Sequence, residues 1–529
     1  MDLITMRETI AAAARISLFV VTTVVGLGWG TPNAQAAERP NIIIMMVDDL
    51  GFSDFGCYGS EIETPNIDRL AKDGLRFRNF YNTGKCHSSR VSLLTGLYCD
   101  QAGSESLKRG VTIAEVLGDA GYTTAMVGKW HLSKQPTDFG FQKYFGHLSG
   151  ATNFFEGDKS FRLNGEKWDD FDDDFYTTDA NVKWAKTFLS ESLAENPDKP
   201  FFLYVAHNAP HYPLHAREED FRKYENRYGE GWDKLRATRY ERQLEMGLIP
   251  KQWELSPRPE LVPEWDTLTD DQKDWERRRM AAYAGMVDRV DQTTGQLVAF
   301  LKEQGIFDNT LILICSDNGA CPFERTRGQE YEPWDPRSYW CYDTGWSHVG
   351  NTPFRLHKQN QHEGGISSPL IAHWPTGLKT KPGAITDQPA HLIDFMATCV
   401  DLGKTEYPSS WPKRKLEPLQ GLSLTPILAG ETRQPHEFLY FHFANNRAIR
   451  QGKWKVVTHR ASQWELYDTE KDGTELNDLA DEYPQRVKEL SQLWHKTAVE
   501  TDHLSGKLIR PVSGKAPPLL RKGGAPAKD

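Results

Sequence analysis

The chain has few cysteines, no excess of basic residues and almost no long apolar run. Its 529 residues include seven cysteines without a C-x-x-C pair, which argues against a disulfide scaffold, zinc knuckles and thioredoxin-type chemistry. The net charge of -10 disfavours a nucleic-acid-binding protein, because neutralising phosphates requires a basic surface. The 39% hydrophobic and 26% charged residues are typical of a folded globular protein and exclude a disordered or polytopic membrane protein.

The single long apolar run lies near the N-terminus. Residues 16–29 are mostly apolar, follow Arg7 and Arg15, and precede Ala34-Gln35-Ala36, which is the pattern of a secretory signal peptide. The run is shorter than the about 20 residues that span a bilayer, so an uncleaved anchor is the less favoured alternative. We therefore predict a signal peptide over residues 1–36, an exported protein in the periplasm or outside the cell, and no stable membrane anchor.

Four apolar segments have the pattern of buried parallel strands, and each ends at polar residues. The segments are 41–47, 124–128, 201–206 and 311–315, with helix-like sequences at 66–73, 111–120 and 280–304. This alternation predicts an α/β fold with a large, mainly parallel sheet covered by helices on both faces. Since ligands bind beyond the carboxyl ends of such strands, we expect the four endings to converge on one crevice.

The character of the sequence changes beyond about residue 405. Pro408, Pro412 and Pro418 mark a linker, segments 438–443 and 454–458 are typical of antiparallel strands, and 483–498 is typical of a helix. We predict an N-terminal catalytic domain over residues 37–405, with a helical or irregular excursion at 217–273. A smaller C-terminal α+β domain with an antiparallel sheet should cover 406–504, followed by a flexible tail at 505–529.

Oxygen-bearing side chains follow two of the expected strands. Asp48 and Asp49 end the first strand, and Asp317 and Asn318 end the fourth. Carboxylate and amide oxygens suit a hard cation such as Ca²⁺ or Mg²⁺ better than zinc. Aspartates at strand ends also cap helices and form turns, so either pair alone favours a structural role. Two pairs at equivalent strand ends favour a cation site.

Cys86 begins a polar stretch over residues 86–90, ahead of an apolar segment that Gly96 is expected to end as a helix. The N-terminus of a helix attracts anions, and Arg90, one turn after Cys86, adds a positive charge on the same side. An isolated cysteine is more often an inert core residue. The polar neighbours of Cys86 argue against simple burial.

Further cations and imidazoles follow the other strands. Lys129 and His131 come after the second strand, His207 and His211 after the third, and Lys358 lies in a polar loop. Each of these residues alone would be read as solvated or structural. Together with a hard cation and a nucleophile, they are the groups needed for displacement at a tetrahedral oxyanion. A sulfate or phosphate ester is therefore the expected substrate.

In order and content, these motifs resemble those of the type I sulfatases of the alkaline phosphatase superfamily, and most closely bacterial arylsulfatases. The resemblance runs from about residue 39 to 494 and rests on Asp48-Asp49 and on residues 64–71, 74–80, 86–96, 128–131, 209–211, 316–319 and 363–365. It implies that a maturation enzyme oxidises Cys86 to formylglycine. One hydroxyl of the hydrated aldehyde would attack sulfur, with His211 or Lys358 assisting the departing oxygen. His131 would then take the proton of the second hydroxyl and sulfate would leave.

The same resemblance implies a ligand set. Ca²⁺, with Mg²⁺ less favoured, would be held by Asp48, Asp49, Asp317, Asn318 and the modified Cys86. Arg90 and Lys129 would contact the hydrate, and Lys358 and His211 the sulfate. One position departs from the family, because Ser88 stands where the maturation motif usually has Pro or Ala.

Several alternatives stay open at this point. The chain is also compatible with a phosphate or phosphonate ester hydrolase on the same fold, or with a sulfated-glycan-binding protein in which Cys86 is not oxidised. Cys321 and Cys341 are candidates for a disulfide in an oxidising compartment. Aryl sulfates, sulfated monosaccharides and polysaccharides would all present the same sulfate group, so the sequence does not identify the natural ester.

Overall fold

The computed structural model describes residues 39–504, so the predicted signal peptide and tail lie outside the described residues. A ten-stranded sheet has the order β11-β2-β10-β9-β1-β8-β4-β5-β6-β7. Four adjacent strands at its centre are parallel and are the four expected from the sequence: β9 (Thr310–Ser316), β1 (Asn41–Val47), β8 (Phe201–Ala206) and β4 (Thr123–Gly128). Their carboxyl ends therefore lie along one edge of the sheet.

Shorter strands extend the sheet on both sides. On one side, β10 (Leu370–His373) is antiparallel to β9 and to β2 (Leu75–Phe77), and β11 (Ala384–Thr386) is parallel to β2. On the other, β5 (Lys143–His147) is parallel to β4, while β6 (Phe161–Leu163) and β7 (Glu166–Lys167) are antiparallel. A separate two-stranded ladder joins β3 (Phe80–Tyr81) to β12 (Ala390–His391). The predicted mainly parallel sheet is confirmed.

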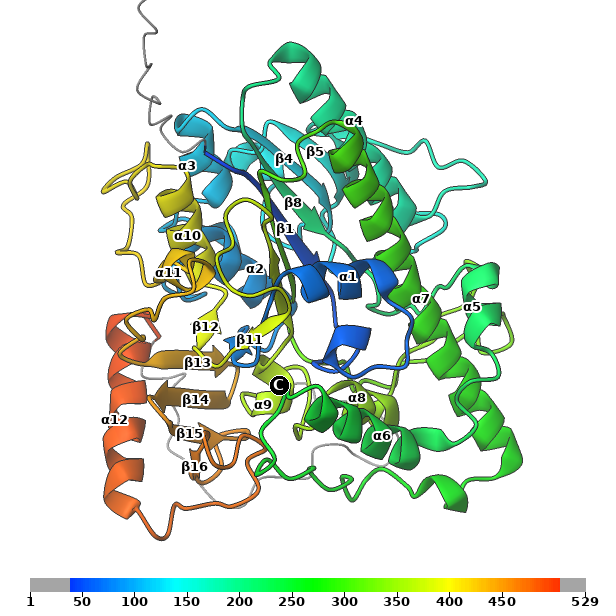
Figure 1. The fold of residues 1–529 in the computed structure, drawn as a ribbon. Helices are drawn as coiled ribbons and strands as arrows, with labels where there is room; N and C mark the ends of the chain where they lie inside the picture. Colours follow the sequence, from blue (N-terminus) through cyan, green and yellow to red (C-terminus); the bar gives the residue numbers. More distant parts are fainter. Residues whose placement is uncertain (1–38, 505–529) are drawn as a thin grey trace, which may run out of the picture. The chain divides into compact units, whose positions relative to one another are not determined.

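Each face of the sheet has its own hydrophobic core. Ile43 and Met45 of β1 belong to a core that includes residues of α1 (Pro65–Asp73), α4 (Thr177–Glu195) and α7 (Asp270–Glu303). Ile42 and Ile44 belong to the opposite core, with α2 (Cys86–Thr95), α3 (Ile113–Asp119) and α10 (Asp394–Leu402). Figure 1 shows these two groups of helices on either side of β1. Burial on both faces explains why β1 is apolar from Ile42 to Val47.

The helices have the expected positions, although one begins earlier. α7 starts at Asp270 rather than at residue 280, because Thr269 and Gln272 form a capping box there. The end of the predicted excursion is thus the first turn of α7, and the excursion also contains α5 (Glu218–Tyr224) and α6 (Gly231–Glu245). Further short helices are α8 (Thr344–Gly350), α9 (Glu363–Ile366) and α11 (Thr425–Leu428). No helix within residues 39–504 is both long and apolar enough to cross a bilayer.

The C-terminal region forms the predicted antiparallel sheet. Its strands are β13 (Leu439–Phe443), β14 (Asn446–Gln451), β15 (Trp454–Thr458) and β16 (Glu465–Asp468), and α12 (Pro484–Glu500) packs on them through Leu490 and Trp494. Leu439 and Phe441 share a second apolar cluster with Tyr81 and Ile366 of the larger part. The small sheet is therefore packed against segments that precede it in the chain.

A buried ion network also joins the small sheet to α9. Lys455 of β15 is fully buried, and its ammonium lies 2.7 Å from Glu363 Oε1 and 2.8 Å from Glu475 Oε1. The backbone N–H of Glu363 donates to Glu475 Oε2 at 2.9 Å. Two buried carboxylates thus share one ammonium group.

Replacing Lys455 by Met should lower the free energy of unfolding by about 3–5 kcal/mol, because it leaves two buried carboxylates without their cation. Urea denaturation measures this loss. Lys453→Met is the matched control on the same hairpin, since Lys453 lies near the surface and pairs with Asp468; its loss should be much smaller. Equal losses in the two variants would show that the buried network does not hold the sheet in place.

Candidate active site

The two acidic pairs lie side by side at the carboxyl ends of β1 and β9. Asp48 and Asp49 follow β1, Asp317 and Asn318 follow β9, and all four side chains are buried. Asp49 has a left-handed backbone with φ 65°. Its backbone N–H donates to Asp317 Oδ1 at 3.2 Å, which ties one strand end to the other.

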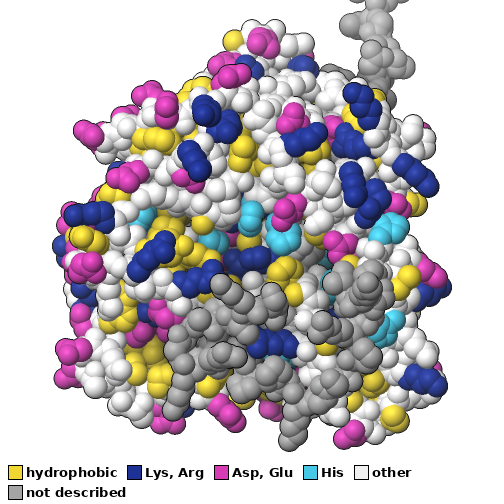
Figure 2. All heavy atoms as spheres, turned by 180° about the vertical axis from the view of Figure 1, so that it is seen from behind, with side chains coloured by type: hydrophobic (Ala, Val, Ile, Leu, Met, Phe, Trp, Pro, Cys, Tyr) yellow, Lys and Arg dark blue, Asp and Glu magenta, His cyan; other side chains and the backbone are white. Residues whose placement is uncertain are grey.

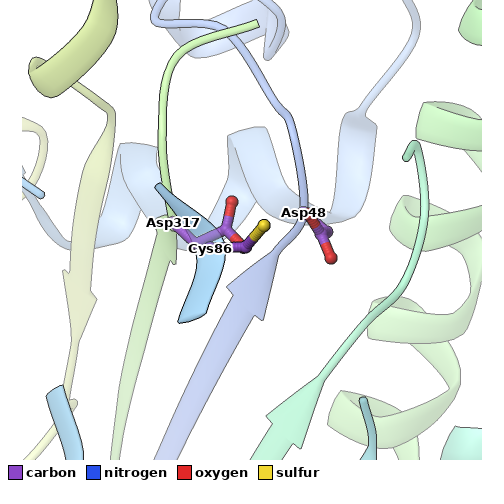
Figure 3. A group of neighbouring side chains, drawn as sticks. All are labelled: Asp48, Cys86 and Asp317. Atoms are coloured by element: carbon purple, nitrogen blue, oxygen red, sulfur yellow. The ribbon is translucent and has the colours of Figure 1, made fainter. Parts of the chain in front are cut away.

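Cys86 lies at the same place, as the first residue of α2. The helix ends at Gly96, which has φ 69°, as the sequence predicts. Cys86 is buried, and its Sγ and one carboxylate oxygen each of Asp48 and Asp317 lie within 4.8 Å of one another. Figure 3 shows the three side chains at the adjoining ends of their elements. The N-terminus of α2 therefore faces the acidic strand ends.

Arg90 links the carboxylates of the two strands. Its buried guanidinium donates from Nη2 to Asp48 Oδ2 at 3.2 Å and to Asp317 Oδ2 at 3.1 Å, and from Nη1 to the Lys129 carbonyl at 3.0 Å. The buried ammonium of Lys129, which follows β4, pairs with Asp48. The sequence placed Arg90 on the side of Cys86 but did not identify these acidic partners.

Lys358 and His211 approach Asp49. The buried ammonium of Lys358 pairs with the Asp49 carboxylate. His211 Nε2 lies 3.6 Å from Asp49 Oδ2, and its Nδ1 donates to the Tyr212 carbonyl at 2.7 Å, which fixes the ring. His207 is fully buried, and neither of its ring nitrogens has a hydrogen-bond partner among the described residues. Of the two candidate histidines, His211 is the one that faces the acidic pairs.

His131 lies at the edge of the site and is partly exposed. Its backbone is left-handed, with φ 56°, and its Nδ1 is buried without a hydrogen-bond partner in the described part of the chain. The ring packs on Gly150, where a Cβ would lie 2.7 Å from His131 Nε2. A glycine is therefore needed at position 150 to leave room for this imidazole.

The buried groups shift one another's pKa. Burial alone would raise the pKa of Asp48, but neighbouring cations, Lys129 first among them, hold it well below its usual value. Burial and the Asp48 charge raise the pKa of Asp317 to about 7. Burial lowers the pKa of His211 to about 3 and also lowers that of His131, so both imidazoles are neutral near pH 7. Asp317 is thus the carboxylate of the site whose burial the neighbouring cations offset least.

Three oxygens of the acidic pairs point to a cation. Asp48 Oδ1, Asp49 Oδ2 and Asn318 Oδ1 are buried and have no hydrogen-bond partner within residues 39–504. The Asn318 amide donates to Asp49 Oδ1 at 2.7 Å, which fixes its own Oδ1 as a free acceptor. An unsatisfied buried acceptor costs about 1–3 kcal/mol, and a hard cation would satisfy all three. The donor set fits Ca²⁺ or Mg²⁺.

Residues 40–405 match the model of the Sulfatase family, which is more than half of the chain. The chain belongs to the sulfatase family. Residues 355–501 of this sulfatase match a second model, that of the C-terminal region of N-sulphoglucosamine sulphohydrolase. The predicted family is confirmed, and with it an enzyme that acts on sulfate esters.

Individual relatives agree with this assignment. An uncharacterized sulfatase of Schizosaccharomyces pombe is 30% identical over 532 residues, covering 89% of this chain and 95% of the relative. An arylsulfatase of Klebsiella aerogenes is 29% identical over 467 residues, covering 80% of this chain and 97% of the relative. The solved structure of i-CgsB with k-i-k-neocarrahexaose has a TM-score of 0.63 at 26% identity, covering 87% and 92% of the two chains. The predicted alkaline phosphatase-like fold is likewise confirmed.

The structure adds contacts that the sequence did not single out. Ser89 Oγ donates to the Asp317 carbonyl at 2.5 Å. Gly319 donates from its N–H to the Gly365 carbonyl at 2.9 Å, and a Cβ on Gly319 would lie 1.9 Å from the Gly364 carbonyl oxygen. Gly319 therefore lets the Asp317 loop approach α9, at the Glu363-Gly-Gly365 motif. The motif was visible in the sequence, but no local pattern reveals a contact with a loop about 45 residues away.

The candidate pair Cys321 and Cys341 is not joined by a disulfide, and all seven cysteines are free. Burial raises the pKa of the Cys341 thiol to about 12, and it raises that of Cys321 well above its usual value. Disulfide formation proceeds through a thiolate, so both thiols are held in their unreactive form.

Proposed function

We propose that this sulfatase hydrolyses sulfate monoesters of phenols or carbohydrates to the alcohol and inorganic sulfate, with residue 86 as the nucleophile. The observation that carries the proposal is the position of Cys86, at a helix N-terminus and next to Asp48 and Asp317. Arg90, Lys129 and Lys358 are buried around the same point. Backbone N–H groups and fixed cations together favour a bound sulfate group.

We further infer that a maturation enzyme oxidises Cys86 to formylglycine and that the protein is exported by its predicted leader. The hydrated aldehyde would supply two hydroxyl groups on one carbon, one to attack sulfur and one whose deprotonation releases sulfate. Ser88, the unusual residue of the maturation motif, donates from Oγ to the Lys85 carbonyl at 2.9 Å. Its hydroxyl is therefore accommodated in the first turn of α2.

The buried cations would neutralise the oxygens of the reacting group. Arg90 and Lys129 are held by Asp48 and would contact the oxygens of residue 86. Burial would lower the pKa of Lys358, but Asp49 raises it well above its usual value, so Lys358 stays an ammonium ion. We assign Lys358 to the sulfate and to the departing oxygen.

The histidines would move the protons. His131 is neutral near pH 7 because burial lowers its pKa, so it is able to take a proton from residue 86. His211 donates from Nδ1 to the Tyr212 carbonyl, which leaves Nε2 directed at the site. His211 or Lys358 would assist the departing oxygen, and of the two Lys358 presents a proton to the site in the resting enzyme, because Nε2 of the neutral His211 carries none.

Asp48, Asp49, Asp317 and Asn318 would hold the cation together with an oxygen of the modified Cys86, and we propose Ca²⁺ in preference to Mg²⁺. Ca²⁺ accepts a larger and more variable set of oxygen ligands. When bound, it would supply positive charge to the sulfate oxygens and lower the pKa of the attacking hydroxyl.

The affinity for Ca²⁺ should rise with pH. Burial and Asp48 raise the pKa of Asp317 to about 7, so below that pH a proton competes with the cation for this carboxylate. Because the cation binds the deprotonated form, the affinity should increase by up to about tenfold per pH unit below pH 7 and level off above it. Calorimetric titration of the whole enzyme between about pH 5 and 8 measures this. A constant affinity across that range would contradict the assignment of Asp317 as a ligand.

Matched para-nitrophenyl sulfate and para-nitrophenyl phosphate test the function. A phosphonate monoester hydrolase of Agrobacterium radiobacter shares the fold, with a TM-score of 0.55 at 19% identity, so the comparison is necessary. We expect faster release of nitrophenol from the sulfate, and its loss when Ca²⁺ is chelated. Faster turnover of the phosphate would favour the phosphatase alternative. Tight binding of sulfated sugars without any turnover would favour a non-catalytic glycan-binding protein.

A further inference from the structure

Two exposed arginines lie on residues 321–341, the segment that follows the Asp317 loop. Arg325 and Arg327 are both exposed, and in the described part of the chain neither forms an ion pair. On the face shown in Figure 2, Lys and Arg side chains gather around a hollow in which histidine side chains are visible. The proposed reaction uses neither arginine.

Aromatic rings hold both guanidinium groups in place. Arg325 Nη1 donates to the Tyr212 hydroxyl at 2.8 Å, and the guanidinium carbon lies 4.8 Å from the centre of the Phe323 ring. The guanidinium carbon of Arg327 lies 4.1 Å from the centre of the Tyr339 ring. The Tyr212 and Tyr339 rings are themselves 5.9 Å apart. The two arginines therefore belong to one aromatic surface, and less side-chain entropy is lost when they bind a ligand.

This surface begins at the candidate active site. The Tyr212 ring lies against that of His211, with 4.2 Å between their centres, and His211 is the residue next to Asp49. Lys358 donates from its backbone N–H to the carbonyl of Ala320, immediately before the segment. Arg325 is therefore linked to the candidate site through Tyr212, which it contacts and which packs on His211.

The acids of the segment do not neutralise these arginines. Glu324 pairs with Arg279, Glu332 with Arg278, and Asp335 with Arg337 at 2.5 Å. The fourth acid, Glu330, is exposed and forms no ion pair within residues 39–504. Two stacked guanidinium groups thus face solvent beside the site with their donors largely free.

We propose that Arg325 and Arg327, on the Tyr212 and Tyr339 rings, form a subsite for a second anionic group of the substrate. This inference rests on the proposed function and names its substrate class, an oligosaccharide that carries a sulfate or carboxylate beyond the scissile sulfate. The planar fork of an arginine matches both anions and binds them with two parallel hydrogen bonds. A substrate with only one anion would leave this subsite unused.

Binding of size-fractionated dextran sulfate and of uncharged dextran oligosaccharides to the whole enzyme tests the subsite. The wild-type enzyme should bind dextran sulfate but not uncharged dextran. The double variant Arg325→Gln, Arg327→Gln should bind dextran sulfate with a Kd about tenfold higher, and this Kd should depend less on the salt concentration. The inhibition constant against para-nitrophenyl sulfate hydrolysis should rise by the same factor. Arg337→Gln is the matched control, because Arg337 is also exposed and stacked, 4.1 Å from the Tyr331 ring, but is paired with Asp335.

Unchanged Kd values in the double variant would overturn the inference, as would an equal rise in Arg337→Gln, which would indicate general attraction to a basic surface. The test of the subsite and the test of the proposed function have different readouts. Absence of sulfate ester hydrolysis would overturn the function, whereas the binding comparison decides the subsite with or without turnover. Circular dichroism of each variant confirms that the fold is retained.

Discussion

Cys86→Ser should retain no more than about one thousandth of the wild-type kcat/KM on sulfate esters, because the variant loses its activated nucleophile. A serine offers one hydroxyl, so it is able to accept sulfate but has no second hydroxyl through which to release it. We therefore expect at most one equivalent of alcohol per enzyme, measured as a burst of nitrophenol followed by arrest. The thiol is buried in α2, so the exchange of sulfur for oxygen should leave the fold intact.

Cys399→Ser is the control for this experiment. Cys399 is also a buried helical cysteine, in α10, and among the described residues it does not belong to the group that Cys86 forms with Asp48 and Asp317, so its variant should turn over normally. Sustained turnover by Cys86→Ser at the wild-type rate would contradict the requirement for two hydroxyl groups on residue 86.

Asp48→Asn should abolish the Ca²⁺-dependent rise in Tm and lower kcat/KM by at least about 10³-fold. Asp48 pairs with Arg90 and Lys129 and also offers the unpartnered Oδ1 to the cation. The variant loses one negative ligand and leaves two buried cations facing a neutral amide. A catalytic cation contributes several kcal/mol of transition-state stabilisation, which corresponds to this loss in rate. Thermal unfolding with and without Ca²⁺, alongside steady-state kinetics, measures both effects.

Asp394→Asn separates loss of the cation site from general destabilisation. Asp394 is equally buried and pairs with Arg433 and His436, so its variant also breaks a buried ion pair. It should unfold at a lower temperature but keep the Ca²⁺-dependent rise in Tm. If Asp48→Asn responded to Ca²⁺ as Asp394→Asn does, Asp48 would not be a ligand.

Much of the fold is predictable because the central strands are buried on both faces. Residues 42–47 and 201–206 are apolar throughout, and they form nearly all of β1 and the whole of β8. The polar residues that follow them occupy one edge because the strands are parallel neighbours. The short antiparallel strand β10 was not predicted, since three apolar residues followed by His373 carry no periodic signal.

The residues of the candidate site could be predicted from the sequence, but the ion pairs and hydrogen bonds between them could not. Lys358 is a surface residue by default, yet it is buried because Asp49, 309 residues earlier in the chain, supplies its counter-charge. Arg325 is exposed, but its position also depends on a distant partner, the Tyr212 hydroxyl, 113 residues earlier in the chain. Sequence patterns report burial and local geometry, whereas these contacts depend on how distant loops meet at the end of the sheet.

Mass spectrometry of the peptide that contains Cys86, from enzyme produced in its native host, tests the central claim most directly. The account predicts the mass of an aldehyde in place of the thiol, with residues 88 and 90 unchanged. Unmodified cysteine at position 86 in enzyme that hydrolyses sulfate esters would contradict it.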